Sequence, residues 1–393
     1  MKDRVELESG YYAPGACDLQ AFLEIVQRKT RAADVPQATD IQKNVPIYDM
    51  KAIRGVLDSS DERSVLLQEW ANILLTGPGV LVLAGAYQQT DVLDQATEIY
   101  EAIIAEEKQA NGAGGDHFAT AGANDRIWNS LQKLCDRAPE VYLDYFSNAS
   151  VAAVCEAWLG PGFQMTAQVN VVYPGGAAQE AHRDYHLGFL TAGQAASYPA
   201  HVHMLSPVLT LQGGIAHCDM PVESGPTKLL PFSQTYRPGY TAFRREDFRA
   251  CFEEHCVQVP LSKGDAIFFN PALFHAAGEN RTKDIHRMAN LLQISSAFGR
   301  AMETVDRSAM CKRLYPMIAA ALSEGRLSED ELAAVIACTA EGYAFPTNLD
   351  SDPPIGGLAP ETQAAFFARA LKEGMDAESF AHRIDAMDAK RQA

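Results

Sequence analysis

The sequence predicts an α+β fold in which helices pack on a β-sandwich or jelly roll. Up to about residue 162, apolar residues recur with the 3.6-residue period of helices, whereas from 163 to about 298 they recur with the period of 2 that is typical of strands. After residue 300 the composition is again rich in Ala, Leu and Glu. Helices that precede a long run of strands commonly cover a sheet. We therefore expect a mainly helical N-terminal part over 1–162, a β-rich core over 163–300 and a helical C-terminal appendage over 301–393, all within one structural unit.

Two helices and a strand are expected in the N-terminal part. Residues 59–75 carry apolar side chains at helical spacing, and Ser59 and Glu62 form the pattern of a capping box. A Gly-Pro-Gly turn ends this helix, and the apolar run 80–83 then indicates a short buried strand. Thr90 begins the second helix, which has a single apolar stripe.

The later segments are interpreted in the same way. Residues 125–159 are expected to be mainly helical, and residues 244–254 indicate a helical insertion among the strands. Candidate strands lie at 202–215, 227–231, 257–261 and 267–269. In the tail, Ser328 and Glu331 form a second capping-box pattern.

Charge and cysteine usage limit the classes of function. The balance of 33 basic against 50 acidic residues gives a net charge of −17, which argues against nucleic acid and anionic membranes as partners and leaves small molecules. The eight cysteines form no Cys-x-x-Cys pair, so we expect reduced thiols and no zinc ribbon. The N-terminal residues are charged, and no window is apolar enough to cross a bilayer, so we expect a cytoplasmic protein. No pattern indicates an oligomeric state.

The stretch from Gln168 to Asp184 carries the clearest chemical signal. It has the pattern of a strand, a Pro-Gly-Gly break and then His182-Arg-Asp184. Residues i and i+2 of an extended segment point to the same side, so an imidazole nitrogen and a carboxylate oxygen can meet at one point. Non-haem Fe(II) oxygenases hold iron on two histidines and one carboxylate. His275, which follows a strand and precedes small residues, is the candidate for the second histidine.

Two other pairs compete for this role. His217 and Asp219 also have the His-x-acid spacing, but Asp219 runs directly into a Pro- and Gly-containing loop. His201 and His203 lie at strand spacing, yet the sequence offers them no clear third ligand. We expect both pairs to be structural or to line a pocket.

Three blocks of the sequence resemble, in the same order, the phytanoyl-CoA dioxygenase (PhyH) family of Fe(II)/2-oxoglutarate-dependent oxygenases. The resemblance covers roughly residues 163–298. The blocks are Tyr173-Pro-Gly-Gly with the following Gln179, His182 and Asp184, then Glu223-Ser-Gly-Pro-Thr227, and finally Gly264-Asp265 with His275, Gly278, Asn280 and Arg287.

This resemblance implies the fold and the cofactors. It implies a double-stranded β-helix (jelly-roll, cupin-like) core, with Fe(II) bound by His182, Asp184 and His275. It also implies that Arg287 anchors the distal carboxylate of 2-oxoglutarate through a bidentate pair. Arg281 is an alternative anchor.

Two polar residues of the first strand are further candidates. Gln168 and Asn170 share one face of that strand, opposite an apolar face. Polar residues on one face of a barrel strand indicate a wet interior, so we expect one of them to contact 2-oxoglutarate or the substrate.

The implied activity is hydroxylation of a C–H bond in a small-molecule metabolite. Fe(II), 2-oxoglutarate and O₂ are the implied cofactors, and succinate and CO₂ are released. A cupin-like metal-dependent hydrolase or isomerase with zinc or manganese at the same ligands is one alternative. A non-catalytic binding protein on the same barrel is another. Dependence on O₂ and 2-oxoglutarate separates the oxygenase from both.

Overall fold

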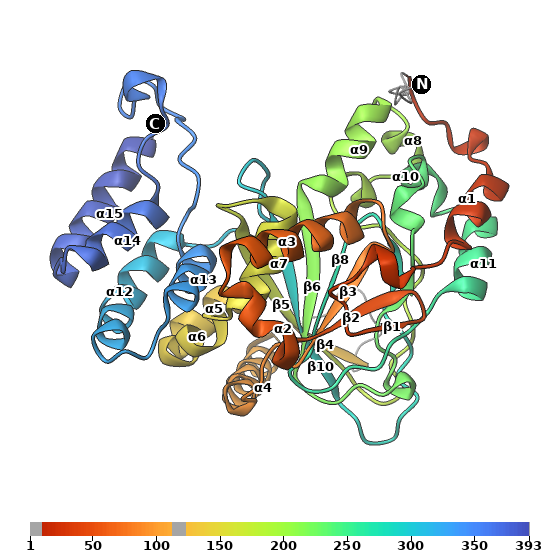
Figure 1. Ribbon diagram of the computed structural model, residues 1–393, viewed down its shortest axis with the longest axis horizontal. Coiled ribbons are helices and arrows are strands. Elements are labelled where there is room, and N and C mark those ends of the chain that lie inside the picture. Colours follow the sequence, from red (N-terminus) through yellow and green to blue (C-terminus); the bar gives the residue numbers. More distant parts are fainter. Residues whose placement is uncertain (1–9, 112–122, 393) are drawn as a thin grey trace.

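Two β-sheets of unequal size face each other at the centre of the fold. The computed structural model describes residues 10–111 and 123–392. The large sheet has eight strands in the order β1-β2-β3-β8-β6-β10-β5-β4, and the small sheet pairs β7 with β9 (Figure 1). The strands are β1 (Asp40–Gln42), β2 (Val45–Asp49), β3 (Val80–Ala84), β4 (Asn124–Ile127), β5 (Gln164–Val172), β6 (Thr210–Ala216), β7 (Lys228–Leu230), β8 (Ala266–Phe269), β9 (Phe274–Ala276) and β10 (Arg287–Ser295).

The chain alternates between the two sheets. Single bridges extend the small sheet on both sides, pairing His182 with His275 and Leu229 with Val257. From β5 onward the chain therefore passes from the large sheet to the small one and back, and neighbouring strands of the large sheet from β8 to β4 are antiparallel. This arrangement is a double-stranded β-helix, and it confirms the predicted fold class.

Strand β5 shows why the sequence folds this way. Its odd-numbered residues Met165, Ala167 and Val169 join the hydrophobic core formed with the helices. Because successive side chains of a strand point to opposite faces, Gln168 and Asn170 turn toward the space between the two sheets. The alternation predicted from the sequence is therefore the alternation between the helical layer and the interior.

Helices cover the outer faces of both sheets. They are α1 (Leu19–Val26), α2 (Met50–Leu57), α3 (Ser60–Leu75), α4 (Asp91–Asn111), α5 (Ser130–Arg137), α6 (Pro139–Phe146), α7 (Ala149–Leu159), α8 (Ala192–Ala195), α9 (Ala200–Val208), α10 (Gly239–Ala242), α11 (Glu246–His255), α12 (Arg307–Ser323), α13 (Glu329–Thr339), α14 (Gln363–Lys372) and α15 (Ala377–Arg391). Helices α1 and α11 lie together over the small sheet, where Phe22, Phe248, Phe252 and Phe274 pack in one cluster (Figure 1). None of the described helices combines the length and the apolar character needed to cross a membrane.

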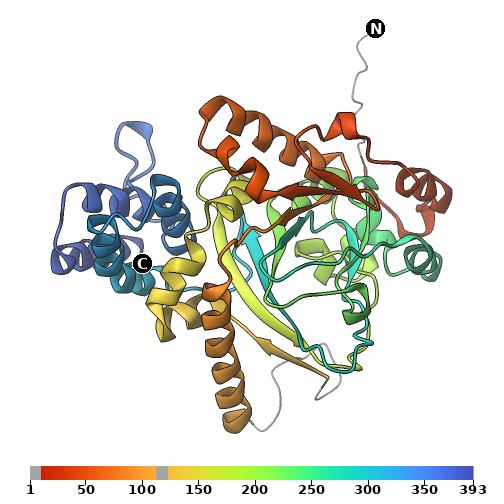
Figure 2. The ribbon, with the colours of Figure 1, turned by 60° about the horizontal axis from the view of Figure 1, so that its bottom comes forward.

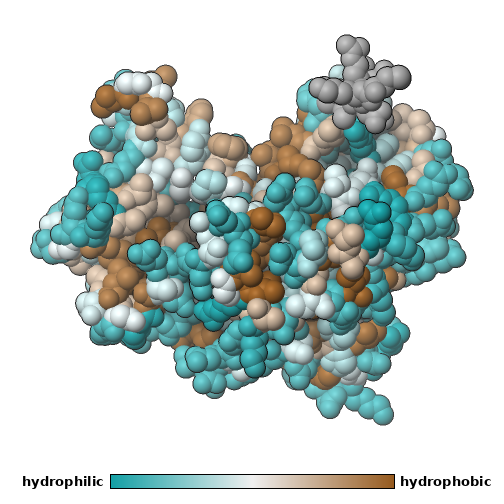
Figure 3. Space-filling view, viewed as in Figure 1, coloured by the Kyte–Doolittle hydropathy of each residue, from teal (hydrophilic) through white to brown (hydrophobic). Residues whose placement is uncertain are grey.

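The C-terminal helices α12–α15 form a lobe at one side of the sheets (Figures 1 and 2). Their apolar residues belong to the same core as those of α5–α7 and β5. At the tip of the lobe the connection before α14 exposes Phe345, Leu349, Ile355 and Leu358. A notch separates this tip from the opposite side of the molecule in Figure 3.

Several predicted elements are confirmed. The strand at 80–83, the helix at 59–75 and the helical insertion at 244–254 correspond to β3, α3 and α11. At α13, Ser328 and Glu331 form both bonds of a capping box, whereas at α3 the side chain of Ser59 makes no capping bond.

The prediction of one strand over 202–215 is wrong in its first half. Residues Ala200–Val208 form the helix α9, and the strand begins only at Thr210. Pro199 precedes the helix in extended conformation as its N-cap, and the helix packs against β6. The short apolar run was compatible with either period, so packing against the sheet decided the structure. The expectation that 125–159 is mainly helical also missed β4, which pairs with β5.

Candidate metal centre

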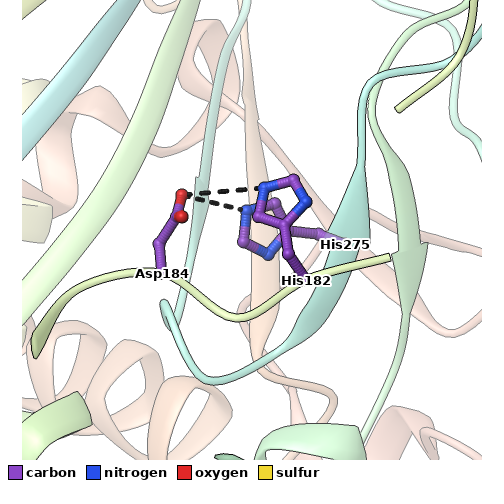
Figure 4. A group of neighbouring side chains, drawn as sticks. All are labelled: His182, Asp184 and His275. Atoms are coloured by element: carbon purple, nitrogen blue, oxygen red, sulfur yellow. Dashed lines mark ion pairs between the residues drawn. The ribbon is translucent and has the colours of Figure 1, made fainter. Parts of the chain in front are cut away.

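Two histidines and one aspartate converge beside the small sheet. His182, Asp184 and His275 each offer one ligand atom, and these three atoms lie within 4.8 Å of one another. Asp184 Oδ2 lies 3.4 Å from His275 Nε2 and 3.8 Å from His182 Nε2. Both imidazole rings reach toward the carboxylate in Figure 4. Within residues 10–111 and 123–392, no other three His, Cys, Asp or Glu side chains meet in this way.

The backbone of the small sheet holds the two histidines next to each other. The His182 N–H donates to the carbonyl of His275 at 3.0 Å, and the His275 N–H donates to the carbonyl of His182 at 3.2 Å. The Asp184 N–H donates to the carbonyl of Pro271 at 3.0 Å. The His-x-Asp segment is therefore fixed at both ends to the segment that carries His275.

Hydrogen bonds of the rings determine which nitrogens carry protons. His182 Nδ1 lies 2.8 Å from the carbonyl of Glu180, and His275 Nδ1 lies 2.8 Å from the carbonyl of Leu273. A carbonyl oxygen only accepts, so each Nδ1 carries a proton, and Nε2 is the nitrogen that is left to bind a metal ion. Burial lowers the pKa of His182, which favours the neutral form of this ring.

Each imidazole therefore directs its Nε2 at the Asp184 carboxylate, where a proton or a metal ion can lie between the two groups. Burial alone would raise the pKa of the Asp184 carboxyl group, but the two imidazoles and a hydrogen bond from Gln212 hold that pKa well below its ordinary value. An ionised carboxylate and two imidazole lone pairs repel one another unless a cation lies between them. Two imidazoles and a carboxylate are the donor set of non-haem Fe(II) sites with open positions, so these residues fit the predicted iron.

The turn after Asp184 has a strained backbone. Tyr185 has φ 61° and ψ 154°, a region almost restricted to glycine, and His186 has φ 37°. The turn buries the Tyr185 side chain, and His186 Nδ1 lies 3.0 Å from Ser206 Oγ on α9. Strain of this kind costs roughly 1–3 kcal/mol per residue and persists only where the surrounding structure enforces it. The fold therefore imposes the conformation of the chain next to the candidate ligand.

Arg183, between the two candidate ligands in the sequence, points away from them into the protein. Its side chain is almost fully buried, and Nη2 donates to the carbonyls of Ser233 at 2.6 Å and Tyr236 at 3.0 Å. The guanidinium carbon lies 5.1 Å from the ring centre of Tyr240 and 5.0 Å from that of Phe274. These contacts fasten the ligand segment to the chain that leads into α10.

Arg287 begins β10 and carries a buried positive charge. Its Nη1 donates to the carbonyls of Ser224 and Gly278, both at 3.1 Å. Within the described part of the chain no acidic side chain forms an ion pair with it, and its other N–H groups have no hydrogen-bond partner. Burial lowers the pKa of Arg287 to about 10, so it stays charged at neutral pH. A buried guanidinium with free donors fits an anionic ligand.

Two glycines bring these carbonyls onto the guanidinium. Gly225 has φ +76°, and a Cβ there would lie 2.3 Å from the carbonyl oxygen of Glu279. A Cβ on Gly278 would lie 2.8 Å from the carbonyl oxygen of Gly225. The two loops approach each other only because neither residue has a side chain. This close approach explains both glycines in the sequence blocks.

Gln168 and Asn170 both face the interior and are buried. Gln168 Oε1 accepts a hydrogen bond from Arg126 Nη1 of β4 at 3.1 Å. Asn170 Oδ1 is buried without a hydrogen-bond partner among the residues that the structure describes. A buried amide oxygen without a partner is costly, so Asn170 is suited to accept a hydrogen bond from a ligand.

The competing pair at His217 and Asp219 has other partners. His217 Nε2 lies 2.9 Å from the Tyr145 hydroxyl, and Nδ1 lies 2.8 Å from the Thr97 hydroxyl. Burial, and next the charge of Lys263, lower the pKa of His217 to about 3. Asp219 Oδ1 accepts the backbone N–H of Lys263 at 2.9 Å. Both ring nitrogens of His217 are therefore occupied within the protein.

The remaining alternatives lie away from the candidate centre. His201 and His203 are on the helix α9 and not on a strand, and His203 Nε2 lies 3.0 Å from the carbonyl of Ala195. Arg281 is exposed at the surface, whereas Arg287 faces the interior.

Three polar residues of the interior, Gln212, Arg183 and Arg126, are not among the candidates expected from the sequence. Gln212 Nε2 donates to Asp184 Oδ2 at 2.5 Å. Thr, Gln and Gly occupy alternate positions of β6, which is the pattern of a strand whose inner face lines a polar interior. Placing the start of this strand at residue 202 concealed that pattern. Nothing in the sequence marks Arg183 or Arg126 as an inward-facing residue.

The sequence of the chain is similar to those of known proteins. The family model described as phytanoyl-CoA dioxygenase (PhyH) matches residues 76–289, more than half of the chain. "Dioxygenase trt7" from Aspergillus terreus (strain NIH 2624 / FGSC A1156) is 23% identical over 229 residues, which cover 57% of this chain and 72% of that protein.

Three of the solved structures that match the chain are the following. The non-haem α-ketoglutarate-dependent epimerase SnoN from nogalamycin biosynthesis has a TM-score of 0.41 and 17% identity, over 60% of this chain and 84% of that one. The carbocyclase SnoK from the same biosynthesis has a TM-score of 0.41 and 18% identity, over 66% of this chain and 90% of that one. AviO1 from Streptomyces viridochromogenes Tue57 has a TM-score of 0.40 and 17% identity, over 59% of this chain and 96% of that one.

Proposed function

Because the chain belongs to the phytanoyl-CoA dioxygenase family of Fe(II)/2-oxoglutarate-dependent oxygenases, we propose that it hydroxylates a C–H bond of a small-molecule metabolite. The observation that carries the proposal is the convergence of His182, Asp184 and His275, whose ligand atoms lie within 4.8 Å of one another. Two imidazoles and one carboxylate form a donor set that suits iron with positions left open for further ligands.

Each part of the site has a distinct task. His182, Asp184 and His275 hold the metal, and the bonds of both Nδ1 atoms to carbonyls keep each Nε2 free to bind it. When bound, Fe(II) with 2-oxoglutarate and O₂ supplies the oxidising chemistry, and 2-oxoglutarate leaves as succinate and CO₂. The remaining residues bind and orient the reactants.

Arg287 is the proposed anchor for 2-oxoglutarate. A guanidinium fork pairs two N–H donors with the two oxygens of a carboxylate, and Arg287 has such donors free in a buried place. The carbonyls of Ser224 and Gly278 hold its Nη1 side, which leaves the rest of the group to face the ligand. A fixed guanidinium of this kind selects a dicarboxylate of matching length.

The interior amides support a substrate or co-substrate with hydrogen-bonding groups. Asn170 presents an acceptor without a partner, and Gln168 is held in place by Arg126. We propose that Asn170 and Gln168 contact 2-oxoglutarate or the substrate. Buried amides left without partners would disfavour a purely aliphatic ligand at these positions.

The proposal is tested by binding first and turnover second. Anaerobic addition of Fe(II) and 2-oxoglutarate should produce the visible charge-transfer band of a bidentate chelate, and His182→Ala, Asp184→Ala and His275→Ala should each abolish it. His217→Ala is the matched control, because His217 is a buried, hydrogen-bonded histidine that lies outside the centre. Metabolites are then screened by succinate release in the presence of O₂. A protein that binds zinc or manganese at these residues and never responds to 2-oxoglutarate would contradict the proposal and favour a hydrolase or isomerase.

A further inference from the structure

Gln212 contacts the candidate metal carboxylate from the large sheet. Its Nε2 donates to Asp184 Oδ2 at 2.5 Å. The same oxygen lies 3.4 Å from His275 Nε2 and 3.8 Å from His182 Nε2. Gln212 therefore holds the carboxylate oxygen that is nearest to both histidines.

The amide of Gln212 can have only one orientation. An ionised carboxylate accepts hydrogen bonds and donates none, so the NH₂ end of the amide must face Asp184. The other end, Oε1, is buried and has no hydrogen-bond partner in the described part of the chain. The contact with Asp184 alone therefore fixes the side chain, and no wider amide network does so.

The neighbouring Gln293 shows what this contact adds. Gln293 pairs directly with Gln212 across β10 and β6, so both side chains point to the same face of the sheet. Gln293 is also buried, and its Oε1 has no partner among residues 10–111 and 123–392. It makes no bond to Asp184. Both amides are therefore buried on the same face of the sheet, and only Gln212 bonds to Asp184.

The two ends of the Gln212–Asp184 bond differ in rigidity. Gln212 lies in the centre of the large sheet, because β6 pairs with β8 on one side and with β10 on the other. Asp184 lies in a loop, where its backbone is held by Pro271 and, at 3.5 Å, by the Tyr240 hydroxyl. The bond therefore ties the Asp184 side chain, which would otherwise rotate about its own bonds, to the large sheet.

We propose that Gln212 is a positioning residue that orients the Asp184 carboxylate and thereby sets the affinity of the site for its metal ion. This inference rests on the proposed function only in that Asp184 is taken as a metal ligand. Partners that hold ligating groups in place typically contribute about 10–100-fold to metal affinity. Gln212 is expected to contribute within that range.

The test compares metal binding by matched variants without any turnover. Affinities for Fe(II) and Zn(II) are measured anaerobically by competition with a chromophoric chelator in the wild-type protein, Gln212→Leu and Gln293→Leu. Gln212→Leu should bind both ions about 10–100-fold more weakly, and Gln293→Leu should stay close to wild type. The d–d spectrum of bound Co(II) should change in Gln212→Leu only. Gln212→Met, which keeps an unbranched chain of similar length, replaces Gln212→Leu if that variant does not fold.

Three outcomes would overturn the inference. They are wild-type affinity in the Gln212 variants, equal losses in the Gln212 and Gln293 variants, and an unchanged Co(II) spectrum in Gln212→Leu. The use of Zn(II) and Co(II) separates this inference from the proposed function. A wild-type protein that binds these ions tightly but forms no 2-oxoglutarate complex would refute the proposed oxygenase function. The metal affinities and Co(II) spectra of the Gln212 variants would still decide the role of Gln212.

Discussion

At the scale of single residues, the two candidate arginines can be told apart. Removing one partner of a desolvated guanidinium–carboxylate pair leaves the other charge unpaired and typically costs about 2–5 kcal/mol. This cost is on the order of 30- to several-thousand-fold in affinity. Arg287→Ala should therefore lose affinity for 2-oxoglutarate by this amount while it still binds Fe(II). Arg287→Lys should lose less, because lysine keeps the charge but not the fork. Titration of 2-oxoglutarate into the Fe(II)-loaded variants measures both.

Arg281→Ala is the control for this prediction. Arg281 is exposed, so its removal should change the affinity for 2-oxoglutarate little. Loss of affinity in Arg281→Ala together with normal affinity in Arg287→Ala would transfer the anchor to Arg281.

A second residue gives a pH dependence that does not involve the metal centre. Glu303 Oε1 accepts the backbone N–H of Asn129 at 2.5 Å, and Oε2 is buried without a partner among the described residues. Burial raises the pKa of Glu303 from 4.5 to about 7, although Asn129, Lys133 and Arg126 act against it. The folded protein therefore holds this proton in a pH range where the unfolded chain has released it.

The sign of the effect follows from linkage. Below about pH 4.5 both states carry the proton, and as the pH rises through 4.5 to about 7 the free energy of unfolding falls by the Glu303 contribution. Glu303→Gln should therefore gain stability relative to wild type between pH 5 and pH 8, as measured by urea unfolding at both values. The exposed Glu254→Gln is the control. A constant difference between Glu303→Gln and wild type at the two pH values would refute the prediction.

At the scale of elements, α10 depends on a glycine that faces Arg183. A Cβ on Gly239 would lie 2.0 Å from Arg183 Cζ, and the guanidinium cannot withdraw without losing its bonds to Ser233 and Tyr236. Gly239→Ala should destabilise the protein by about 1–3 kcal/mol, as overpacked cores do. The matched control is Gly193→Ala in α8, where a Cβ would meet nothing within 4 Å. Denaturant unfolding that showed equal stability for the two variants would mean that α10 adjusts freely.

The sequence predicted elements best where local pattern and packing agree. The alternation of β5 revealed both its buried face and the inward Gln168 and Asn170, since the same pleat governs both. The prediction from sequence failed at α9. A run of mixed apolar residues there satisfies the period of a helix and that of a strand, and contact with β6 decides between them. Strand β4 was not predicted from the sequence, because its extended conformation comes from pairing with β5.

The candidate site was predictable to a different extent. The spacing of His182 and Asp184 indicates a ligand pair, because two alternate residues of an extended segment share a side. Gln212 and Arg183 were not predictable, since their roles come from contacts with residues far away in the chain. Candidate ligands are therefore easier to predict from a sequence than the residues that hold them in place.

At the scale of the whole molecule, we expect the C-terminal lobe and the sheets to unfold together. The apolar residues of α12–α15 belong to one core with those of α5–α7. Arg307 Nη2 donates to the carbonyl of Met165 in β5 at 2.9 Å, and the hydroxyl groups of Tyr142 and Thr339 lie 3.3 Å apart. Calorimetry should therefore show a single transition for the full chain. A chain that ends at Arg300 should be less stable and expose apolar surface.

Separate transitions for the two parts would contradict this expectation. So would a truncated chain that kept full stability, because the lobe would then be an independent domain.

The unequal size of the two sheets has a consequence for hydrogen exchange. Strand β10 is paired over nine positions with β5 and over seven with β6, whereas β7 and β9 pair over three, and a single bridge joins His182 to His275. Amide protons exchange with solvent when local opening breaks such pairs, and small paired units open at lower free energy than the whole fold. In heavy water, deuterium should therefore enter the small sheet long before it enters β10. We therefore expect the side of the barrel that carries the histidines to open locally while the large sheet stays closed, and the proposed metal ion to enter and leave through this opening.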